Sequence, residues 1–407
     1  MNATATALLI EAERYLENED VDRAAECFRR AQVLEEGGAP SPAVGLARVA
    51  LILGRLDDAE KILDHVLAHH PKSAEALTYR GVVADAREDP SAALQLLEQA
   101  VAADATFAPA HANLGRLLGQ LGRWPEACLA FRTALAKAPR QPALVPLLAL
   151  AATRAGSLKE AIEVLTKHLE RAPDHLDAIV TLADVLLEAK MVDRATELLA
   201  NAVERLPRVA VLHARQSGLA LRRGDLRLAR SAVAKQIALT PTDEEALLYA
   251  ATLELMRRDL EQAEQLVQRA LELAPESWRA HYQLGLIYDA LRLKGPALVA
   301  YRMAMKHGPR AWQPRNNLAT MLLEERSATS AREALALLEE AITLGSNGDA
   351  PDAPDAPDAR YNLALAHWQL GQSAASERAA RQVACLAVNS PIVATAKRFL
   401  GNFTPAS

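Results

Sequence analysis

The chain has 407 residues, of which 50% are hydrophobic and only 4% aromatic, and its formal net charge is −5. A mildly acidic chain has no overall attraction for nucleic acid or for an anionic membrane surface. No stretch approaches the roughly 20 apolar residues that a membrane-spanning helix needs, and the first apolar run is too short for a signal peptide. We therefore expect a cytoplasmic protein that binds no nucleic acid and does not insert into a membrane.

Small residues recur at a fixed spacing in chain order. The pattern begins with Ala12, Ala24, Phe28 and Ala31. From Ala59, a step of 34 residues then reaches an alanine each time: Ala93, Ala127, Ala161, Ala195, Ala229, Ala263 and Ala297. A second column of small residues precedes the alanines by twelve positions: Ala47, Gly81, Gly115, Ala149, Ala183, Ser217, Ala251 and Gly285. Prolines follow most of the alanines by twelve positions: Pro71, Pro139, Pro173, Pro207, Pro241, Pro275 and Pro309.

This spacing predicts two helices in every period. Ala127, Phe131 and Ala134 share one face of a helix because they stand four and seven residues apart, and Pro139 ends that helix. Glycines between the two small-residue columns mark the turn between the helices: Gly54, Gly122, Gly156 and Gly224. One such hairpin cannot bury its own apolar face, so neighbouring hairpins must stack. The sequence therefore predicts an all-α solenoid.

The pattern resembles the tetratricopeptide repeat family. The 34-residue period, the "NLG" of Asn113–Gly115 and the "YQLGLIY" of residues 282–288 carry the resemblance. It implies a right-handed superhelical solenoid of about eleven antiparallel helix pairs, followed by a C-terminal capping helix. Members of the family mostly bind other proteins in the groove that the first helix of each repeat lines.

Four segments are expected along the chain. Residues 1–343 form repeats 1 to 10, and three extra residues in the tenth repeat move its alanine to Ala334. Residues 344–360 contain three Pro-Asp-Ala units and form an extended acidic loop. Residues 361–390 form repeat 11, in which Ser376 replaces the alanine. Residues 391–407 form a capping helix and tail, with Phe399 and Phe403 on the apolar face of the helix.

The sequence contains no motif that supports an active site. It has no glycine-rich phosphate loop, no His-Glu-x-x-His and no Gly-x-Ser-x-Gly. His65 and His69 stand one helical turn apart, but no further metal ligand is evident nearby. We predict a protein that is not an enzyme and has no cofactor and no metal site.

The family resemblance assigns a set of residues to the groove in the N-terminal and middle repeats: Arg48, Asn113, Arg116, Arg154, Arg215 and Arg222. Residues 205–235 contain seven Arg and one Lys against a single Asp, a local net charge of +7 in an acidic chain. Guanidinium groups match carboxylates well, so one interpretation is an acidic protein or peptide partner. The other is a set of solvated helix faces.

The C-terminal third differs, because it contains nine of the sixteen aromatic residues. The resemblance places Tyr282, Tyr361 and Trp368 in the groove. Asn317 and Asn362 take the same repeat position as Asn113, and the position carries backbone-gripping asparagines in the peptide-binding arm of O-GlcNAc transferases. The resemblance to that arm is partial, since most other repeats lack the asparagine. No three successive repeats supply the Lys and Asn set of chaperone-binding members.

We therefore predict an interaction scaffold or adaptor that binds an extended protein segment in its groove. Two alternatives stay open: an assembly factor for a bacterial surface, pilus or secretion apparatus, and the substrate-selecting subunit of a transferase whose catalytic part is on another chain. The sequence does not indicate the oligomeric state.

Overall fold

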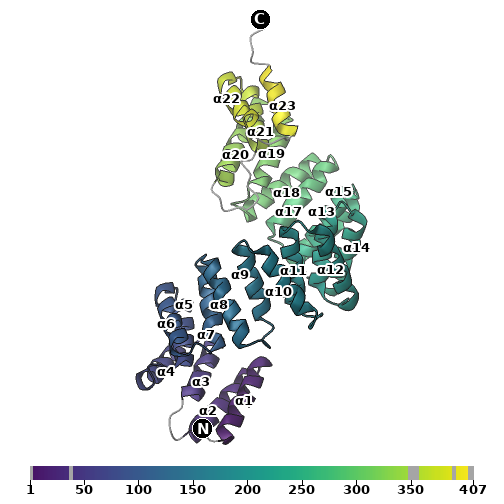
Figure 1. Ribbon diagram of the computed structural model, residues 1–407. Coiled ribbons are helices and arrows are strands. Elements are labelled where there is room, and N and C mark those ends of the chain that lie inside the picture. The colour runs from purple at the N-terminus through teal and green to yellow at the C-terminus, as the bar shows by residue number, and fades with distance from the viewer. Residues whose placement is uncertain (1–2, 36–39, 347–356, 387–390, 402–407) are drawn as a thin grey trace. The chain divides into compact units, whose positions relative to one another are not determined.

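The computed structural model describes residues 3–35, 40–346, 357–386 and 391–401, and in these ranges it contains 23 helices and no strand (Figure 1). The chain divides into two compact units, Met1–Pro207 and Arg208–Ser407. The first unit comprises α1 (Ala3–Glu17), α2 (Val21–Leu34), α3 (Pro40–Ile52), α4 (Leu56–His69), α5 (Ala74–Ala86), α6 (Pro90–Ala103), α7 (Ala108–Gln120), α8 (Trp124–Lys137), α9 (Leu144–Arg154), α10 (Leu158–Leu169), α11 (Leu176–Glu188) and α12 (Val192–Arg205). The second comprises α13 (Ala210–Arg222), α14 (Leu226–Leu239), α15 (Glu244–Met256), α16 (Leu260–Leu273), α17 (Trp278–Ala290), α18 (Lys294–His307), α19 (Gln313–Leu323), α20 (Ala328–Ser346), α21 (Pro357–Gln369), α22 (Ser373–Ala384) and α23 (Pro391–Leu400).

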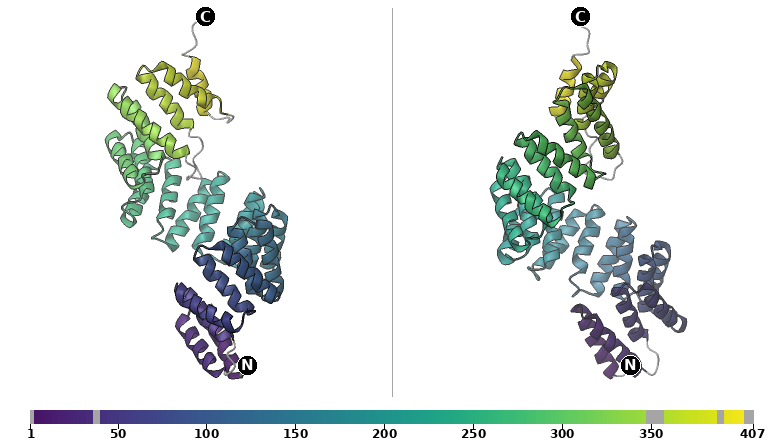
Figure 2. Two further views of the ribbon diagram at one scale, coloured as in Figure 1. Left: turned by 90° about the vertical axis from the view of Figure 1, so that its left-hand side faces the viewer. Right: turned by 180° about the vertical axis from the view of Figure 1, so that it is seen from behind.

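The helices form hairpins that pack on their neighbours. Each odd-numbered helix from α1 to α21 packs against the helix that follows it, and within each unit successive hairpins lie side by side (Figures 1 and 2). Helix α23 has no following partner among the described residues and packs on α21 and α22. The predicted all-α solenoid of eleven helix pairs with a capping helix is confirmed.

Small residues on the first helix of a hairpin face large residues on the second. Gly115 of α7 is buried, and a Cβ atom added to it would lie 3.1 Å from the ring of Phe131 on α8. At Gly285 of α17 an added Cβ would lie 2.5 Å from the ring of Tyr301 on α18, which is fully buried. The predicted columns of small residues therefore mark places where two helices pack closely.

Every hairpin turn contains a residue with a left-handed backbone. Five of these residues are glycines: Gly54, Gly122, Gly156, Gly224 and Gly371. The other six are Glu19, Glu88, Lys190, Arg258, Arg292 and Arg326, with φ between 52° and 62°. The turn geometry is thus common to all eleven hairpins, whereas the glycine that suits it best is present in fewer than half.

The tenth hairpin has a longer second helix than most other hairpins. Ala334, Leu338 and Ala341 are fully buried at the spacing 0, 4, 7, but Ala331, which stands 34 residues after Ala297, is fully buried as well, so the shift to Ala334 stays a prediction. Helix α20 is 19 residues long, whereas the second helices of most other hairpins have 14. Helix α20 begins 34 residues after the start of α18, so its additional residues lie toward its C-terminal end.

The expected acidic loop is shorter than predicted. Helix α21 begins at Pro357, and Ala359 is fully buried, so the third Pro-Asp-Ala unit forms its first turn. The prediction that this unit cannot be helical was wrong, because Pro is well accommodated at the first position of a helix. The loop's central residues 347–356 lie outside the described residues, and so does Phe403.

Candidate functional site

The candidate site is a set of equivalent positions on the first helix of each hairpin. We number each of these helices so that its residue in the second column of small residues, such as Gly115, is position 8. In this numbering, the family resemblance assigns positions 2, 5, 6, 9, 12 and 13 to the groove. We call these positions the groove face. The following paragraphs give the surroundings of each predicted site residue.

Arg48 of α3 is engaged within its own unit. Its guanidinium binds both carboxylate oxygens of Glu13 on α1, with 3.0 Å from Nη2 to Oε2, and lies over the ring of Tyr79 on α5 at 5.3 Å. Burial raises the pKa of the Tyr79 hydroxyl. Burial also raises the pKa of Glu75, although a hydrogen bond with Ser41 and the charge of Arg48 act in the opposite direction. Arg48 therefore joins three consecutive hairpins.

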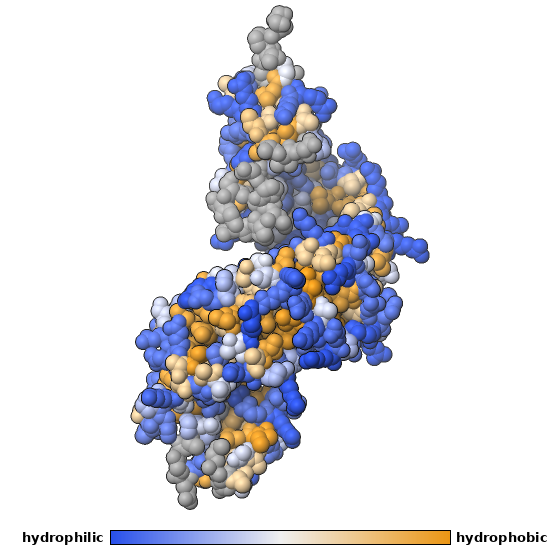
Figure 3. All heavy atoms as spheres, in the orientation of Figure 1, coloured by the Kyte–Doolittle hydropathy of each residue, from blue (hydrophilic) through white to orange (hydrophobic). Residues whose placement is uncertain are grey.

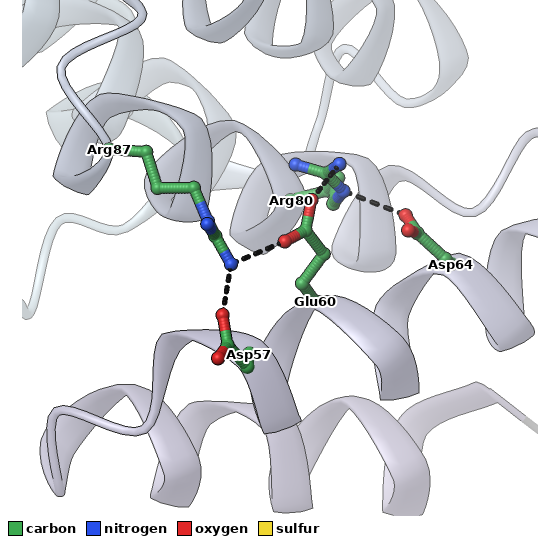
Figure 4. Close-up of polar contacts among 5 residues, drawn as sticks. All are labelled: Asp57, Glu60, Asp64, Arg80 and Arg87. Carbon is green, nitrogen blue, oxygen red and sulfur yellow. Dashed lines mark hydrogen bonds and ion pairs between the residues drawn. The ribbon is translucent and has the colours of Figure 1, made fainter.

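Neighbouring arginines in these hairpins are also paired. Arg80 of α5 binds Glu60 at 2.5 Å and Asp64 at 2.7 Å, both on α4. Arg87 binds Asp57 at 2.5 Å and Glu60 at 2.6 Å, so that Glu60 bridges the two guanidinium groups (Figure 4). These pairs hold the second hairpin against the third and leave little unneutralised positive charge there.

Arg116 and Asn113 of α7 also have partners. Arg116 donates to Asp85 of α5 at 2.8 Å. Asn113 donates to the backbone carbonyl of Pro109, one turn earlier in its own helix, at 2.9 Å. Asp85 is the more buried member of its ion pair, with 17% of the side chain exposed against 39% for Arg116. The outer part of the Arg116 side chain thus stays accessible to a partner.

Arg154 and Arg222 differ from these arginines. Both are exposed and both end the first helix of their hairpin, at position 13. In the described ranges neither has an acidic group within ion-pair distance. Arg215 on α13 is exposed too, but it is not one of the arginines without a partner. A cation at a helix C-terminus is favoured by the helix dipole, but that interaction leaves the guanidinium donors available.

The two predicted groove asparagines of the C-terminal repeats bind the preceding first helix. Asn317 of α19 donates to the hydroxyl of Tyr282 at 3.3 Å. Asn362 of α21 donates to Asn316 and Thr320, both on α19, at 3.0 Å. These amides tie adjacent hairpins together and leave part of their hydrogen-bonding capacity for a partner.

Two glutamines that the sequence analysis did not select act in the same way. Gln283 of α17 donates to the Leu248 carbonyl and to Thr252 at 3.0 Å. Gln369 of α21 donates to the Leu323 carbonyl at 2.9 Å. Both glutamines occupy groove positions and could therefore have been selected from the sequence. The sequence analysis considered only asparagine, arginine and aromatic residues at these positions.

The three predicted aromatic residues are packed to different degrees. Tyr282 lies 6.0 Å from the Tyr301 ring, and burial raises the pKa of its hydroxyl. Phe399 of the capping helix lies edge-to-face with both Tyr361, at 6.0 Å, and Trp368, at 5.7 Å. Trp368 is still 43% exposed, so it presents the larger accessible apolar surface.

The sequence analysis missed an apolar part of the groove face on α9. Leu147 and Leu150 take positions 6 and 9 of this helix and are 38% and 45% exposed. Apolar residues gather on the side of the first unit where α9 lies (Figure 3). The signal was available in the sequence, because residues 144–153 contain no charge.

Other kinds of site find less support in the structure. Within the described ranges, no three His, Cys, Asp or Glu side chains are grouped so that they could hold a metal ion. The Nδ1 atom of His69 lies 2.9 Å from the backbone carbonyl oxygen of His65, within hydrogen-bond distance. None of the described helices combines the length and the apolar character that crossing a membrane requires.

Family models for the tetratricopeptide repeat match residues 9–62, 44–106, 113–175, 152–216, 248–304 and 323–391. The chain belongs to the tetratricopeptide repeat family. Proteins built from these repeats typically act as interaction scaffolds. No curated protein matches the chain in sequence.

Several solved structures are similar to this chain. The structure of yeast Tom70 matches with a TM-score of 0.51 and 16% identity, over 98% of this chain and 95% of that chain. The structure of the Cut9–Hcn1 hetero-tetramer of the APC/C matches with a TM-score of 0.47 and 15% identity, over 98% of this chain and 90% of that chain. The structure of a thermophilic tetratricopeptide repeat protein of Thermus thermophilus matches with a TM-score of 0.39 and 25% identity, over 45% of this chain and 99% of that chain. At 16% identity the likeness to Tom70 concerns the fold alone.

Proposed function

We propose that this protein is a non-enzymatic scaffold that binds an extended, acidic segment of a protein partner along its groove face. The observation that carries the proposal is the contrast among the arginines of that face. Arg48 and Arg116 are paired with carboxylates of their own chain, whereas Arg154 and Arg222 are exposed with no carboxylate at ion-pair distance among the described residues. Exposed leucines of α9 supply apolar surface beside the first of these two arginines.

Photo-crosslinking can test whether the groove face is the binding surface. A photoreactive amino acid is placed at Leu150, which is 45% exposed on the groove face, or at Leu129 of α8, which is 60% exposed on a second helix. We expect covalent adducts with a discrete protein from position 150 and not from position 129, as identified by mass spectrometry in intact cells. Adducts from position 129 alone would contradict the groove assignment, and no adduct from either position would contradict the scaffold.

Salt dependence tests the acidic character of the partner. Exposed ion pairs weaken as ionic strength rises, because the Debye length falls from about 10 Å at 0.1 M to about 3 Å at 1 M. The double variant Arg154→Ala, Arg222→Ala should therefore bind the crosslinked partner more weakly in low salt and with a flatter salt dependence. An unchanged salt dependence would remove the acidic partner from the proposal. The cytoplasmic location, the bacterial setting and the absence of nucleic-acid binding stay predictions from the sequence.

A further inference from the structure

The groove face of the first unit changes its charge between α9 and α11, two helices that pack directly against each other. Helix α9 contains one charged residue, Arg154, which is exposed and stands at position 13. Helix α11 contains no basic residue and three carboxylates, Asp177, Asp184 and Glu188, at positions 2, 9 and 13. All three carboxylates are exposed. An exposed cation and exposed anions therefore lie on neighbouring helices of the groove face.

Glu188 is the carboxylate that the fold does not explain. Asp177 lies in the first turn of α11, where the helix dipole favours a negative charge, and Asp184 has an interaction partner. Glu188 ends the helix, where the dipole disfavours a negative charge. It also follows Asp184 by four residues, a spacing at which like charges repel each other. Among the described residues, no Lys or Arg forms an ion pair with Glu188.

Arg154 and Glu188 do not neutralise each other. They take the same position of two neighbouring helices, yet no ion pair joins them in the part of the chain that the structure describes. Opposite charges on neighbouring first helices do pair elsewhere on the groove face, as Arg116 of α7 does with Asp85 of α5 at 2.8 Å. Both Arg154 and Glu188 are therefore available to a partner.

Apolar side chains border the cation. Leu147 and Leu150 of α9 are 38% and 45% exposed, and they share one side of the helix because they stand three residues apart. Arg154 is four residues beyond Leu150, which places it one turn further along the same side, about 6 Å along the helix axis. A partner that reaches Arg154 would therefore also meet apolar surface.

We propose that the partner segment changes from acidic to basic where it passes from α9 to α11, so that a carboxylate side chain binds Arg154 and a Lys or Arg side chain binds Glu188. An apolar side chain beside the carboxylate covers Leu147 and Leu150. The proposal rests on the proposed function, because it specifies the segment that the groove face binds. A segment that is acidic throughout would bring a carboxylate against Glu188, and like charges across an interface repel each other.

The helix spacing sets the separation of the two charges in the partner. The axes of packed helices lie about 8–10 Å apart, and an extended chain advances about 3.3 Å per residue. A segment that crosses the groove face from helix to helix therefore places its acidic and its basic residue about three positions apart. The apolar residue should be a neighbour of the acidic one, because Leu150 and Arg154 are only one helical turn apart.

The test uses the full chain and a phage-displayed library of random short peptides. We expect the enriched peptides to share an apolar residue next to Asp or Glu, with Lys or Arg about three positions away. The strongest peptide is then synthesised in two altered copies, one with Lys in place of its acidic residue and one with Glu in place of its basic residue. Fluorescence anisotropy should show that the wild-type protein binds each copy about tenfold more weakly, which corresponds to about 1.4 kcal/mol.

Reversing charges in the protein identifies the two contacts. Arg154→Glu should restore binding of the copy in which Lys replaces the acidic residue. Glu188→Arg should restore binding of the copy in which Glu replaces the basic residue. Each variant should bind the unaltered peptide about tenfold more weakly than the wild-type protein does. A purely structural role for either residue would not exchange the preference for one peptide against the other, because the exchange requires direct contact between the two charges.

Two matched control variants are Lys167→Glu and Glu163→Arg. Both residues are exposed on α10, the second helix of the hairpin that contains α9, and the substitutions change the net charge as the test variants do. They should leave the affinity for all three peptides unchanged. All four variants should melt at the wild-type temperature, because substitutions of exposed residues seldom affect stability.

The outcomes separate this inference from the proposed function. If the enriched peptides are acidic and contain no basic residue, or if Glu188→Arg restores no binding, the change of charge is wrong and the inference is overturned, while the acidic partner stands. If neither Arg154→Glu nor Glu188→Arg alters the affinity for any peptide, the inference is overturned because the segment binds elsewhere. If the wild-type protein enriches no peptide, the proposed function fails and the inference fails with it.

Discussion

Ser217 donates a hydrogen bond of 2.7 Å from Oγ to the backbone carbonyl of Ala229, joining the two helices of the seventh hairpin. In the eleventh hairpin the roles are exchanged: Ser376, on the second helix, donates to the carbonyl of Ala364 on the first at the same distance. Both serines are fully buried. A hydroxyl can therefore replace alanine in either small-residue column when a carbonyl of the facing helix accepts its proton.

The first prediction concerns the stability that the contact between Ser217 and Ala229 contributes. Ser217→Ala should lower the free energy of unfolding by about 1 kcal/mol, because it removes one buried hydrogen bond and creates no overlap. Ala229→Leu should cost about 1–3 kcal/mol, since the facing helices leave no room for a larger side chain. Urea unfolding followed by circular dichroism measures both. A larger loss for Ser217→Ala than for Ala229→Leu would contradict the close packing.

The turns give the second prediction. Arg292 has a φ of 60°, a conformation that costs residues other than glycine about 1–2 kcal/mol. Arg292→Gly should therefore raise the melting temperature, and Gly156→Arg, at a φ of 83°, should lower it. Thermal unfolding of the two variants provides the comparison. If Arg292→Gly were less stable than the wild type, contacts of the arginine side chain would outweigh the backbone strain.

The third prediction concerns pH. His168 Nε2 and His175 Nδ1 lie 2.8 Å apart between α10 and α11, and burial followed by the charge of His175 lowers the pKa of His168. The unfolded chain therefore takes up this proton at a higher pH than the folded chain. The stability that depends on neutral His168 is fully present above the ordinary pKa of 6.5 and is lost as the pH falls below it, through the lowered pKa of the folded chain.

The pH prediction is checked by chemical unfolding between pH 7.5 and pH 5, a range around the ordinary histidine pKa of about 6.5. His168→Gln should make the free energy of unfolding less dependent on pH than in the wild type. His69→Gln is the control, because it removes a histidine that lies outside this pair. If the free energy of unfolding depended equally on pH in the two variants, the His168–His175 pair could not be the cause of the pH dependence.

The acidic segment gives the fourth prediction. Deleting residues 349–359 should lower the melting temperature, because it removes the first turn of α21 and the buried Ala359. Deleting residues 349–354 should change it little, since shortening a loop alters its closure entropy only slightly. If the two deletion variants melted at the same temperature, the first turn of α21 would be dispensable for stability.

Much of the fold could be predicted, because the physical requirement repeats. Close packing demands a small residue at the same place in every hairpin, so a fixed spacing such as that of Ala127 and Ala161 identifies the helix pairs. The turns show the limit of this argument. Six of them have a left-handed residue that is not glycine, and only the period, not the residue type, identifies their positions. Pro357 was misassigned because proline both ends helices and begins them.

The site was less predictable, since a groove position does not determine which way a side chain turns. Asn317 and Asn362 take the expected position, yet they bind the preceding helix. The pairing of Arg48 was foreseeable, because Glu13 stands 35 residues earlier with the opposite charge. A search for opposite charges one period apart would have separated Arg48 from Arg154 before the structure was known.

The contrast between Arg48 and Arg154 gives the last prediction. Arg48→Ala should lower the free energy of unfolding by about 1–2 kcal/mol, because it removes a cation–π contact and a partly buried ion pair and leaves Glu75 without a neighbouring cation. Arg154→Ala should leave the melting temperature unchanged and should weaken binding of the crosslinked partner in low salt. Thermal unfolding and binding titrations on the same two variants test both statements. If Arg154→Ala lost stability as Arg48→Ala does, Arg154 would hold the fold together and would have to be removed from the candidate site.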